Sequence, residues 1–427
     1  MKNLCILWMN LILALGAAAA QNMPEGQASI SGRVLDVSNS PYPAEVDVFQ
    51  IVIHAGLAHL EMKCSRNTNQ DGAFTCPKLS GAKFIVQVLP QSRLGKQVQE
   101  AQDAAAGTIP KSLFYSNVTD LEEATPISLG NNEAGWAEVR VAESPAVEVK
   151  GTLTNRTPVA FFRLEAESGR LTLDTRIHPE YDGRTGRFVF SHVPAGHYQL
   201  TAHSLNFQTA TLRFVMEATP VEGLLLSATP DVVLVSGQFA ALPSGGNISE
   251  LSLVSADGST RDLNTSVKDG AFNFGPVPVG EYIVRLPLGQ QVYVDSITVG
   301  GKSVDGSKFS VVPGQGTVHL EPEVKGPSVP IRGSVQQWEG PAVSAEVIAQ
   351  SEDSGEIYKV TTGKQRNFLF AGVKPGEYRL FAWPGIDTIE YRNPLVLKKY
   401  NDDSTEVRVD QDNLGGAIEL SPIEKEH

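Results

Sequence analysis

The stretch Gly186–Leu200 reads GRFVFSHVPAGHYQL, and the chain repeats its pattern in three other places. The further copies are Gly72–Val88 (GAFTCPKLSGAKFIVQV), Gly270–Leu286 (GAFNFGPVPVGEYIVRL) and Asn367–Phe381 (NFLFAGVKPGEYRLF). Each copy holds two aromatic residues ten positions apart, namely Phe74 and Phe84, Phe188 and Tyr198, Phe272 and Tyr282, and Phe368 and Tyr378. Copies in one shared register indicate an internal repeat.

The first aromatic residue of a copy belongs to an alternating pattern. Phe188 and Phe190 are separated by one residue, so both point to the same face of an extended strand, and this face is expected to be buried. Pro194 and Gly196 then favour a tight turn, and a second alternating run opens on Tyr198. We therefore predict that each copy is a β-hairpin whose aromatic residues are structural anchors of a core.

A shared opening precedes every copy. Its pattern is apolar-x-Gly-x-apolar, and its glycines are Gly32, Gly151, Gly237 and Gly333. Glycine inside a strand permits close approach of a neighbouring backbone, or a bulge. Between the opening and the first aromatic lie another strand-like run and turns such as Ser168-Gly169, which favour hairpins. Each repeat therefore has about seven short strands, enough for a two-sheet sandwich.

The length and composition fit several such sandwiches. The chain has 427 residues, with 39 glycines and 26 prolines placed between alternating runs, which is typical of an all-β protein of three or four domains. We predict four tandem sandwiches over residues 24–145, 146–229, 230–325 and 326–427. The polar, alanine-rich segment 91–112 is expected to be a surface excursion inserted in the first.

The N-terminal segment predicts export. Residues 1–20 place Lys2 before an apolar run and end in Ala18-Ala19-Ala20, the pattern of a cleaved signal peptide. No later stretch is apolar for long enough to span a membrane as a helix. The mature protein is therefore expected in the periplasm, or secreted to the cell surface. The formal net charge of −13 argues against nucleic acid as a partner.

Two cysteines remain after the signal peptide. Cys64 and Cys76 flank the turn-forming stretch Asn67–Gly72 almost symmetrically. In an oxidising compartment we expect a disulfide between them, across the two strands of one hairpin. A redox or metal site is disfavoured because the spacing and further ligands for one are missing.

At this point the pattern resembles a known family. The opening, followed by D-G-x-F-x-F and V-P-x-G-x-Y, is similar to the carboxypeptidase regulatory-like domains. Asp269–Phe274 and Val277–Tyr282 match fully, whereas Asp71–Phe74 and Arg366–Phe368 match in part. The resemblance implies Greek-key, transthyretin-like (prealbumin-like) sandwiches of seven strands, found in many exported bacterial proteins. It also implies carbohydrate as a conceivable ligand class, because the family is grouped with carbohydrate-binding-like folds.

A search for catalytic patterns in the sequence predicts no enzyme, metal or cofactor. Neither HExxH nor a Gly-x-Ser-x-Gly elbow occurs, and these are the local signatures of zinc peptidases and α/β-hydrolases. His192, His197 and His203 form the nearest approach to a cluster. Their odd and even spacings spread them over different strand faces, so we interpret them as surface histidines.

Aromatic residues in the last repeat suggest one ligand site. Trp338, Trp383, Tyr391 and Tyr400 all fall in residues 326–427, and exposed aromatic faces with a few polar partners can bind sugars. The alternative, which we favour, is that Trp383 packs a loop onto its own domain.

Taken together, the sequence predicts a non-catalytic exported protein that binds, adheres or acts as a scaffold at the cell envelope. Its partner would be an envelope protein or polysaccharide. A carbohydrate-binding module is the first alternative, and an accessory string of domains for an envelope enzyme or transporter is the second. The fold motif itself does not discriminate among these functions.

Overall fold

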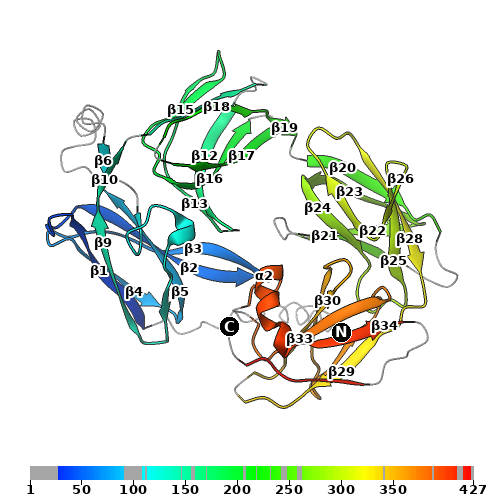
Figure 1. Ribbon diagram of the computed structural model, residues 1–427. Coiled ribbons are helices and arrows are strands. Elements are labelled where there is room, and N and C mark those ends of the chain that lie inside the picture. The colour runs from blue at the N-terminus through cyan, green and yellow to red at the C-terminus, as the bar shows by residue number, and fades with distance from the viewer. Residues whose placement is uncertain are drawn as a thin grey trace, which may run out of the picture. The chain divides into compact units, whose positions relative to one another are not determined.

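The computed structural model describes residues 27–90, 108–110, 113–145, 147–154, 159–169, 171–204, 208–217, 219–230, 232–241, 248–256, 262–339, 342–386, 389–410 and 417–424. The expected signal peptide and most of the 91–112 excursion lie outside these residues. The described chain is all-β (Figure 1), apart from the short helix α2 (Pro394–Leu397) and the 3-10 turns η1 (Leu121–Glu123) and η2 (Lys398–Asp403).

Two sheets form in repeat 1, the sandwich predicted over residues 24–145. One sheet contains β4 (Ala73–Leu79), β1 (Ala28–Asp36) and β9 (Ala134–Val141), in that order. The other contains β3 (Leu57–Asn67), β2 (Ala44–His54), β5 (Ala82–Pro90) and β7 (Leu113–Phe114), with β8 (Ile127–Leu129) also paired to β5. A separate short pair joins β6 (Thr108–Pro110) and β10 (Glu143–Pro145).

Repeat 2, predicted over 146–229, also has two sheets. The first is ordered β14 (Glu180–Asp182), β15 (Arg187–Phe190), β11 (Val149–Leu153), β18 (Val221–Leu226). The second is ordered β13 (Leu171–Asp174), β12 (Val159–Ser168), β16 (Gly196–Ser204), β17 (Gln208–Met216), β19 (Thr229–Pro230). As predicted, β12 and β13 form a hairpin across Ser168-Gly169.

In repeat 3, predicted over 230–325, the two layers join into one nine-stranded sheet because β22 pairs with both β21 and β23. Its order is β26 (Lys302–Asp305), β25 (Tyr293–Val299), β28 (Val318–Lys325), β20 (Val232–Gln238), β23 (Ala271–Pro278), β22 (Leu263–Lys268), β21 (Glu250–Ser255), β24 (Gly280–Arg285), β27 (Lys308–Val311).

Repeat 4, predicted over 326–427, again has two sheets. One contains β32 (Asn367–Phe370), β29 (Ile331–Val335) and β35 (Ile418–Leu420). The other contains β31 (Ile357–Thr361), β30 (Glu346–Ser351), β33 (Gly376–Trp383) and β34 (Thr405–Val409).

The same strand pairing recurs four times. The opening strand of each repeat pairs antiparallel with the strand of the first aromatic and parallel with the closing strand. In the other layer, the strand of the second aromatic pairs antiparallel with the repeat's second strand. This sharing of one topology explains why the sequence pattern repeats, since each copy must fill the same positions.

Each opening glycine lies directly opposite the first aromatic residue. Gly237, for example, is paired with Phe272, and a Cβ added to Gly237 would come within 3 Å of the Phe272 ring and of the carbonyl oxygen of Leu320 on the parallel strand. Gly32, Gly151 and Gly333 are enclosed in the same way. The predicted close approach of backbone is therefore the reason for these glycines.

The prediction of a hairpin at each copy of the motif is wrong. The strands of the two aromatics do not pair with each other: β15 belongs to one sheet and β16 to the other, and β32 and β33 are divided likewise. The motif therefore crosses between the layers, and in repeat 4 Phe368 and Tyr378 reach one core from opposite sheets. Both side chains are buried, as are the corresponding residues of the other copies.

A hydrogen bond closes this crossing in three of the repeats. The hydroxyl of Tyr198 donates to the carbonyl oxygen of Pro194 at 3.0 Å, that of Tyr282 to Pro278 at 2.9 Å, and that of Tyr378 to Lys374 at 2.6 Å. Each bond joins the second aromatic to the residue four positions earlier, so it holds the connection against the core. Repeat 1 has Phe84 at this position and lacks the hydroxyl.

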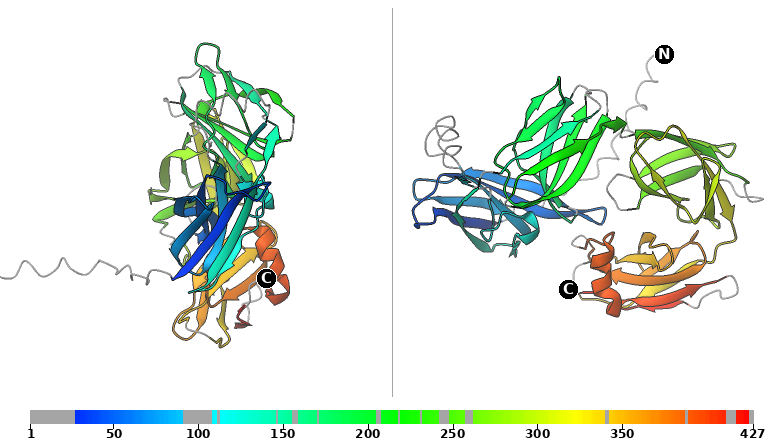
Figure 2. Two further views of the ribbon diagram at one scale, coloured as in Figure 1. Left: turned by 90° about the vertical axis from the view of Figure 1, so that its left-hand side faces the viewer. Right: turned by 45° about the horizontal axis from the view of Figure 1, so that its top comes forward.

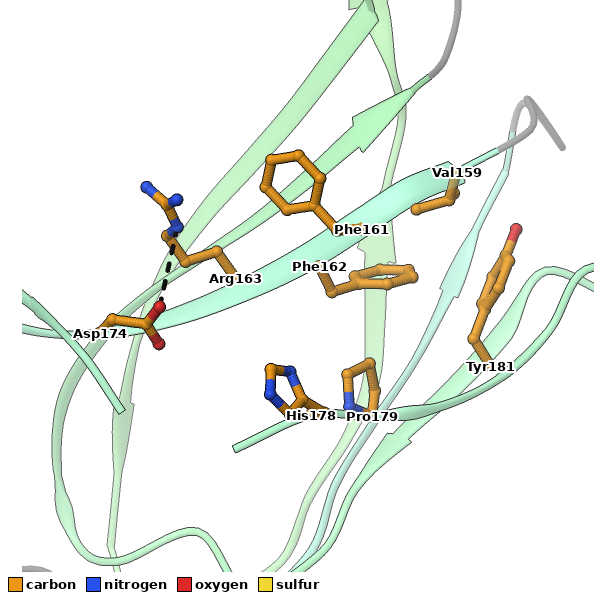
Figure 3. A pocket seen from close by; sticks show the side chains of 8 residues that line it. All are labelled: Val159, Phe161, Phe162, Arg163, Asp174, His178, Pro179 and Tyr181. Atoms are coloured by element: carbon orange, nitrogen blue, oxygen red, sulfur yellow. Dashed lines mark ion pairs between the residues drawn. The ribbon is translucent and has the colours of Figure 1, made fainter. Parts of the chain in front are cut away.

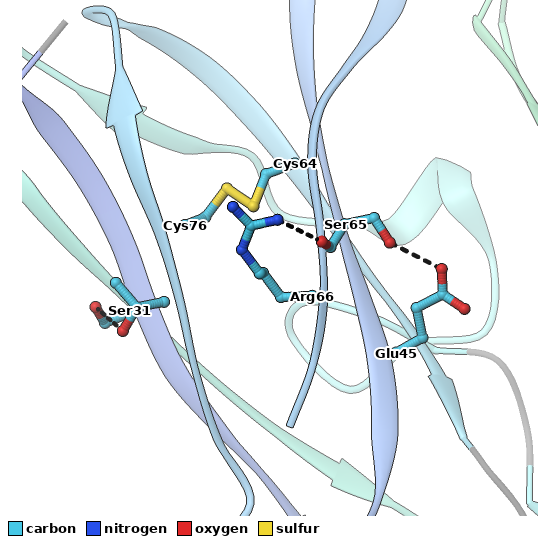
Figure 4. Close-up of a disulfide and its surroundings, with 7 residues drawn as sticks. Ser31, Glu45, Cys64, Ser65, Arg66 and Cys76 are labelled. Atoms are coloured by element: carbon cyan, nitrogen blue, oxygen red, sulfur yellow. Dashed lines mark hydrogen bonds between the residues drawn. A yellow bond between two sulfur atoms is a disulfide. The ribbon is translucent and has the colours of Figure 1, made fainter. Parts of the chain in front are cut away.

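The Cys64–Cys76 disulfide also joins the two layers rather than the two strands of a hairpin (Figure 4). Cys64 lies on β3 and Cys76 on β4, which belong to different sheets, and both are part of the core of repeat 1. The predicted disulfide between Cys64 and Cys76 is therefore confirmed. The prediction that it crosses one hairpin is wrong, because the turn between the two cysteines carries the chain from one sheet to the other.

Contact density divides the chain into two compact units. The first comprises residues 1–50, 62–119 and 123–144, and the second comprises 51–61, 120–122 and 145–427. Inside the second unit, repeats 3 and 4 are joined by Arg285, whose Nε lies 2.9 Å from a carboxylate oxygen of the buried Glu356. The division into four independent domains remains a prediction.

Candidate functional site

A groove of about 360 Å³ opens beside β12 in repeat 2 (Figure 3). Its lining residues are Val159, Phe161, Phe162, Arg163, Asp174, His178, Pro179 and Tyr181. They come from the first half of β12 and from the segment that leaves β13 and reaches β14 in the other sheet. The groove therefore lies where the chain crosses from one layer of the sandwich to the other.

The backbone of β12 is only partly covered along this groove. On this side β13 pairs with Glu165–Ser168, and Thr175 donates its backbone N–H and its hydroxyl to the carbonyl oxygen of Leu164. Within the described residues, no strand pairs with Val159–Arg163 on this side, whereas β16 pairs with them on the other. An open stretch of strand edge thus borders the groove, and such an edge can accept another strand.

Side chains on both faces of β12 contribute to the groove. On the outer face, Phe161 is 48% exposed, its ring stacks on His203 with centroids 4.4 Å apart, and the Arg163 guanidinium lies 5.8 Å from its centroid. On the inner face, Phe162 is buried and its ring contacts Tyr181 at 5.0 Å. The rim of the groove is therefore aromatic and partly apolar.

The polar groups of the groove remain largely in contact with solvent. Arg163 and Asp174 face each other at 4.0 Å, and their side chains are 47% and 53% exposed. Partial burial raises the pKa of Tyr181, and the negative charge of Asp182 adds to the effect. A loose, solvent-exposed ion pair of this kind is suited to recognition rather than to acid–base catalysis, which requires positioned groups.

Of the four aromatic residues suggested for a sugar site, Trp383, Tyr391 and Tyr400 are buried in repeat 4, whereas Trp338 is half-buried. Trp383, Tyr391 and Tyr400 belong to a second apolar cluster on the outer face of the β33 sheet, to which α2 contributes Leu397 and η2 contributes Tyr400 itself. Figure 2 shows the ribbon of α2 beside this sheet. Only 2% of Trp383 is exposed, and its ring stacks on Phe381. Trp338 is half-buried and donates from Nε1 to the carbonyl oxygen of Ala342.

This burial agrees with the alternative in which Trp383 packs a loop onto its own domain. A sugar ring could stack on Trp383, Tyr391 or Tyr400 only if the layer of α2 and η2 opened. We therefore do not propose a sugar site on them. No sequence motif predicts the groove in repeat 2, because its residues come from one strand and from a connecting segment that is far from regular in pattern.

The three histidines of repeat 2 do not share one site. His203 stacks on Phe161, whereas the Nδ1 of His197, the second residue of β16, lies 2.6 Å from Asp120 Oδ2. His192 adopts a left-handed backbone conformation in the connection between the two layers, with φ of 65°. The structure therefore separates the histidines, but it gives one of them acidic neighbours that come from a distant part of the sequence.

No protein-family model matches the chain, and no curated protein matches it. Solved structures with some similarity share little sequence with it. The Bacillus anthracis TIE protein is 11% identical, with 95% of this chain and 74% of that protein covered and a TM-score of 0.16. A streptococcal ancillary pilin is 14% identical, covering 65% of this chain and 98% of its own, with a TM-score of 0.18.

A minor pilin of Streptococcus agalactiae is 13% identical, covering 48% of this chain and 97% of its own, with a TM-score of 0.20. TM-scores this low carry no argument about function, so the fold rests on the strand pairing itself. The described residues contain no helix long and apolar enough to cross a membrane.

Proposed function

We propose that the protein is an exported, non-catalytic binding protein of the cell envelope, and that its groove beside β12 accepts an extended peptide segment of a protein partner. The observation that carries this proposal is the open edge of β12 over Val159–Arg163. An added strand would bond to this edge through its main chain. Its alternate side chains would enter the groove or lie against Phe161.

The predicted signal peptide supports export. The disulfide between Cys64 and Cys76 also supports it, because disulfides form and persist in oxidising compartments outside the cytosol. The residues common to the repeats support a binding role, because they are used for cores, crossings and close backbone approach. The residues that differ among the repeats are therefore the ones that can bind a partner, and the groove residues of repeat 2 are among them. The match to carboxypeptidase regulatory-like domains remains a resemblance of motifs.

The test is a selection of random seven-residue peptides displayed on phage against the mature chain. We expect extended peptides whose affinity falls at least about tenfold when every second backbone nitrogen is methylated, because methylation removes ladder hydrogen bonds. Phe161→Ala should weaken the same peptides. Leu369→Ala is the matched control, since Leu369 is an exposed apolar residue (55%) on a strand of repeat 4.

Peptides that tolerate backbone methylation would contradict strand addition. A panel of soluble polysaccharides run beside the selection addresses the carbohydrate alternative. Saturable polysaccharide binding that Phe161→Ala abolishes, with no peptide selected, would replace the peptide proposal by a carbohydrate-binding function for the same groove.

A further inference from the structure

Outside the groove, three side chains of the second unit bring metal-ligating atoms together. Asp120 and Glu122 stand on either side of the buried Leu121, and His197 is the second residue of β16. The Nδ1 of His197 lies 2.6 Å from Oδ2 of Asp120 and 3.4 Å from Oε2 of Glu122. The ligand atoms of all three lie within 4.8 Å of one another, close enough for one cation to contact them all.

The three side chains differ in how firmly they are held. The side chain of Asp120 is 14% exposed, and its Oδ1 accepts the backbone N–H of Glu122 at 3.0 Å, which directs Oδ2 toward the imidazole. His197 and Glu122 are 43% and 59% exposed. One ligand is therefore fixed, while the other two face solvent and can adjust around an ion that also keeps water ligands.

We propose that Asp120, Glu122 and His197 form a binding site for a divalent transition-metal ion of the zinc type. One imidazole nitrogen with two carboxylates is a mixed donor set that suits Zn²⁺, which commonly takes three protein ligands and water. Calcium and magnesium require more oxygen ligands than this cluster offers. The two carboxylates also neutralise the charge of the ion.

Binding at this site competes with a proton. The hydrogen bond that the His197 imidazole donates to the Asp120 carboxylate raises the pKa of His197, and the negative charges of Asp120, Glu122 and, from β12, Glu167 add to it. Metal binding requires the neutral imidazole. Affinity should therefore fall as the pH decreases through the raised pKa of His197.

Isothermal titration calorimetry of the EDTA-treated mature chain with Zn²⁺ tests the proposal. We expect saturable binding at a ratio of about one ion per chain, with Ca²⁺ at least about tenfold weaker. His197→Gln and Asp120→Asn should each reduce Zn²⁺ affinity at least about tenfold. His319→Gln is the matched control, because His319 is also half exposed and lies 3.9 Å from a single carboxylate, Glu321.

Zn²⁺ affinity that is unchanged by His197→Gln, or equally reduced by His319→Gln, overturns the site. Thermal unfolding of each variant in EDTA shows whether the variants remain folded. A second measurement uses the unmodified chain: substoichiometric Mn²⁺ should broaden the imidazole resonances of His197 in NMR spectra before those of His319. Equal broadening of both would also contradict the proposal, whatever the outcome of the peptide selection.

Discussion

Gly237 and Phe272 face each other across β20 and β23, and the ring of Phe272 covers the glycine backbone. The same pair of residue types occurs in every repeat, as Gly32 with Phe74, Gly151 with Phe188, and Gly333 with Phe368. A side chain at the glycine would displace either the ring or the parallel strand. At the scale of single residues, the missing Cβ is therefore as important as the aromatic ring.

Gly237→Ala tests this packing. The added Cβ would meet the carbonyl oxygen of Leu320 and the Phe272 ring, and overpacking of this kind typically costs about 1–3 kcal/mol of unfolding free energy. Gly316→Ala is the matched control in the same repeat, because nothing lies within 4 Å of an added Cβ there. Urea unfolding measures both, and equal stability of the two variants would contradict the packing argument.

Tyr378→Phe tests the hydrogen bond to Lys374, and loss of about 1 kcal/mol is expected at neutral pH. Burial raises the pKa of Tyr378 well above its ordinary value, with the charge of Glu356 adding to the effect. The unfolded chain therefore ionises first, so the contribution of the phenol is present below about pH 10 and is lost at higher pH. The difference in unfolding free energy between the parent chain and Tyr378→Phe should therefore be smaller above about pH 10 than at neutral pH, which urea unfolding at both pH values measures.

At the scale of elements, the connection after the first aromatic strand determines the fold. It carries the chain between layers in each repeat, and in repeat 1 the turn before that strand also changes sheets. The disulfide spans this change at a Cα–Cα distance of 6.0 Å. In repeat 4, α2 and η2 add a second apolar layer outside the sheet, which explains why Trp383 is buried.

The Cys64–Cys76 link should therefore stabilise the association of the two layers of repeat 1. Cys64→Ser with Cys76→Ser is expected to lower the unfolding free energy by roughly 3 kcal/mol, because the loop it closes becomes free in the unfolded chain. Thermal unfolding compares the variant with the parent chain, and peptide mapping without reductant checks the pairing. Free thiols in the exported protein would refute it.

At the scale of the whole molecule, the contacts inside the second unit couple repeats 3 and 4. Arg285 donates from Nη2 to the carbonyl oxygen of Ile357 at 2.9 Å, pairs with Glu356, and lies 4.5 Å from the centroid of the Tyr358 ring. Lys374 adds a bond to the carbonyl oxygen of Asp295. These contacts link repeats 3 and 4.

Arg285→Ala should uncouple them. Removing one partner of a largely buried ion pair costs about 3 kcal/mol, and the connection near Gly326 should then become sensitive to limited proteolysis. Arg408→Ala is the control, because Arg408 is 74% exposed and lies 3.9 Å from each of two carboxylates, Glu377 and Asp410. If Arg285→Ala leaves the digestion pattern unchanged, the two repeats are not held together by this contact.

Residue patterns in the sequence were sufficient to predict the all-β class, the repeat, the buried aromatic anchors and a close backbone approach or bulge at the opening glycines. These features depend on strand periodicity and local steric demands, which a short stretch of chain encodes. Only the tertiary structure showed which layer each strand joins, that α2 and η2 are the elements that cover Trp383, and that Asp120 meets His197 from 77 positions away. Such placements depend on long-range packing and strand pairing, so no local pattern specifies them.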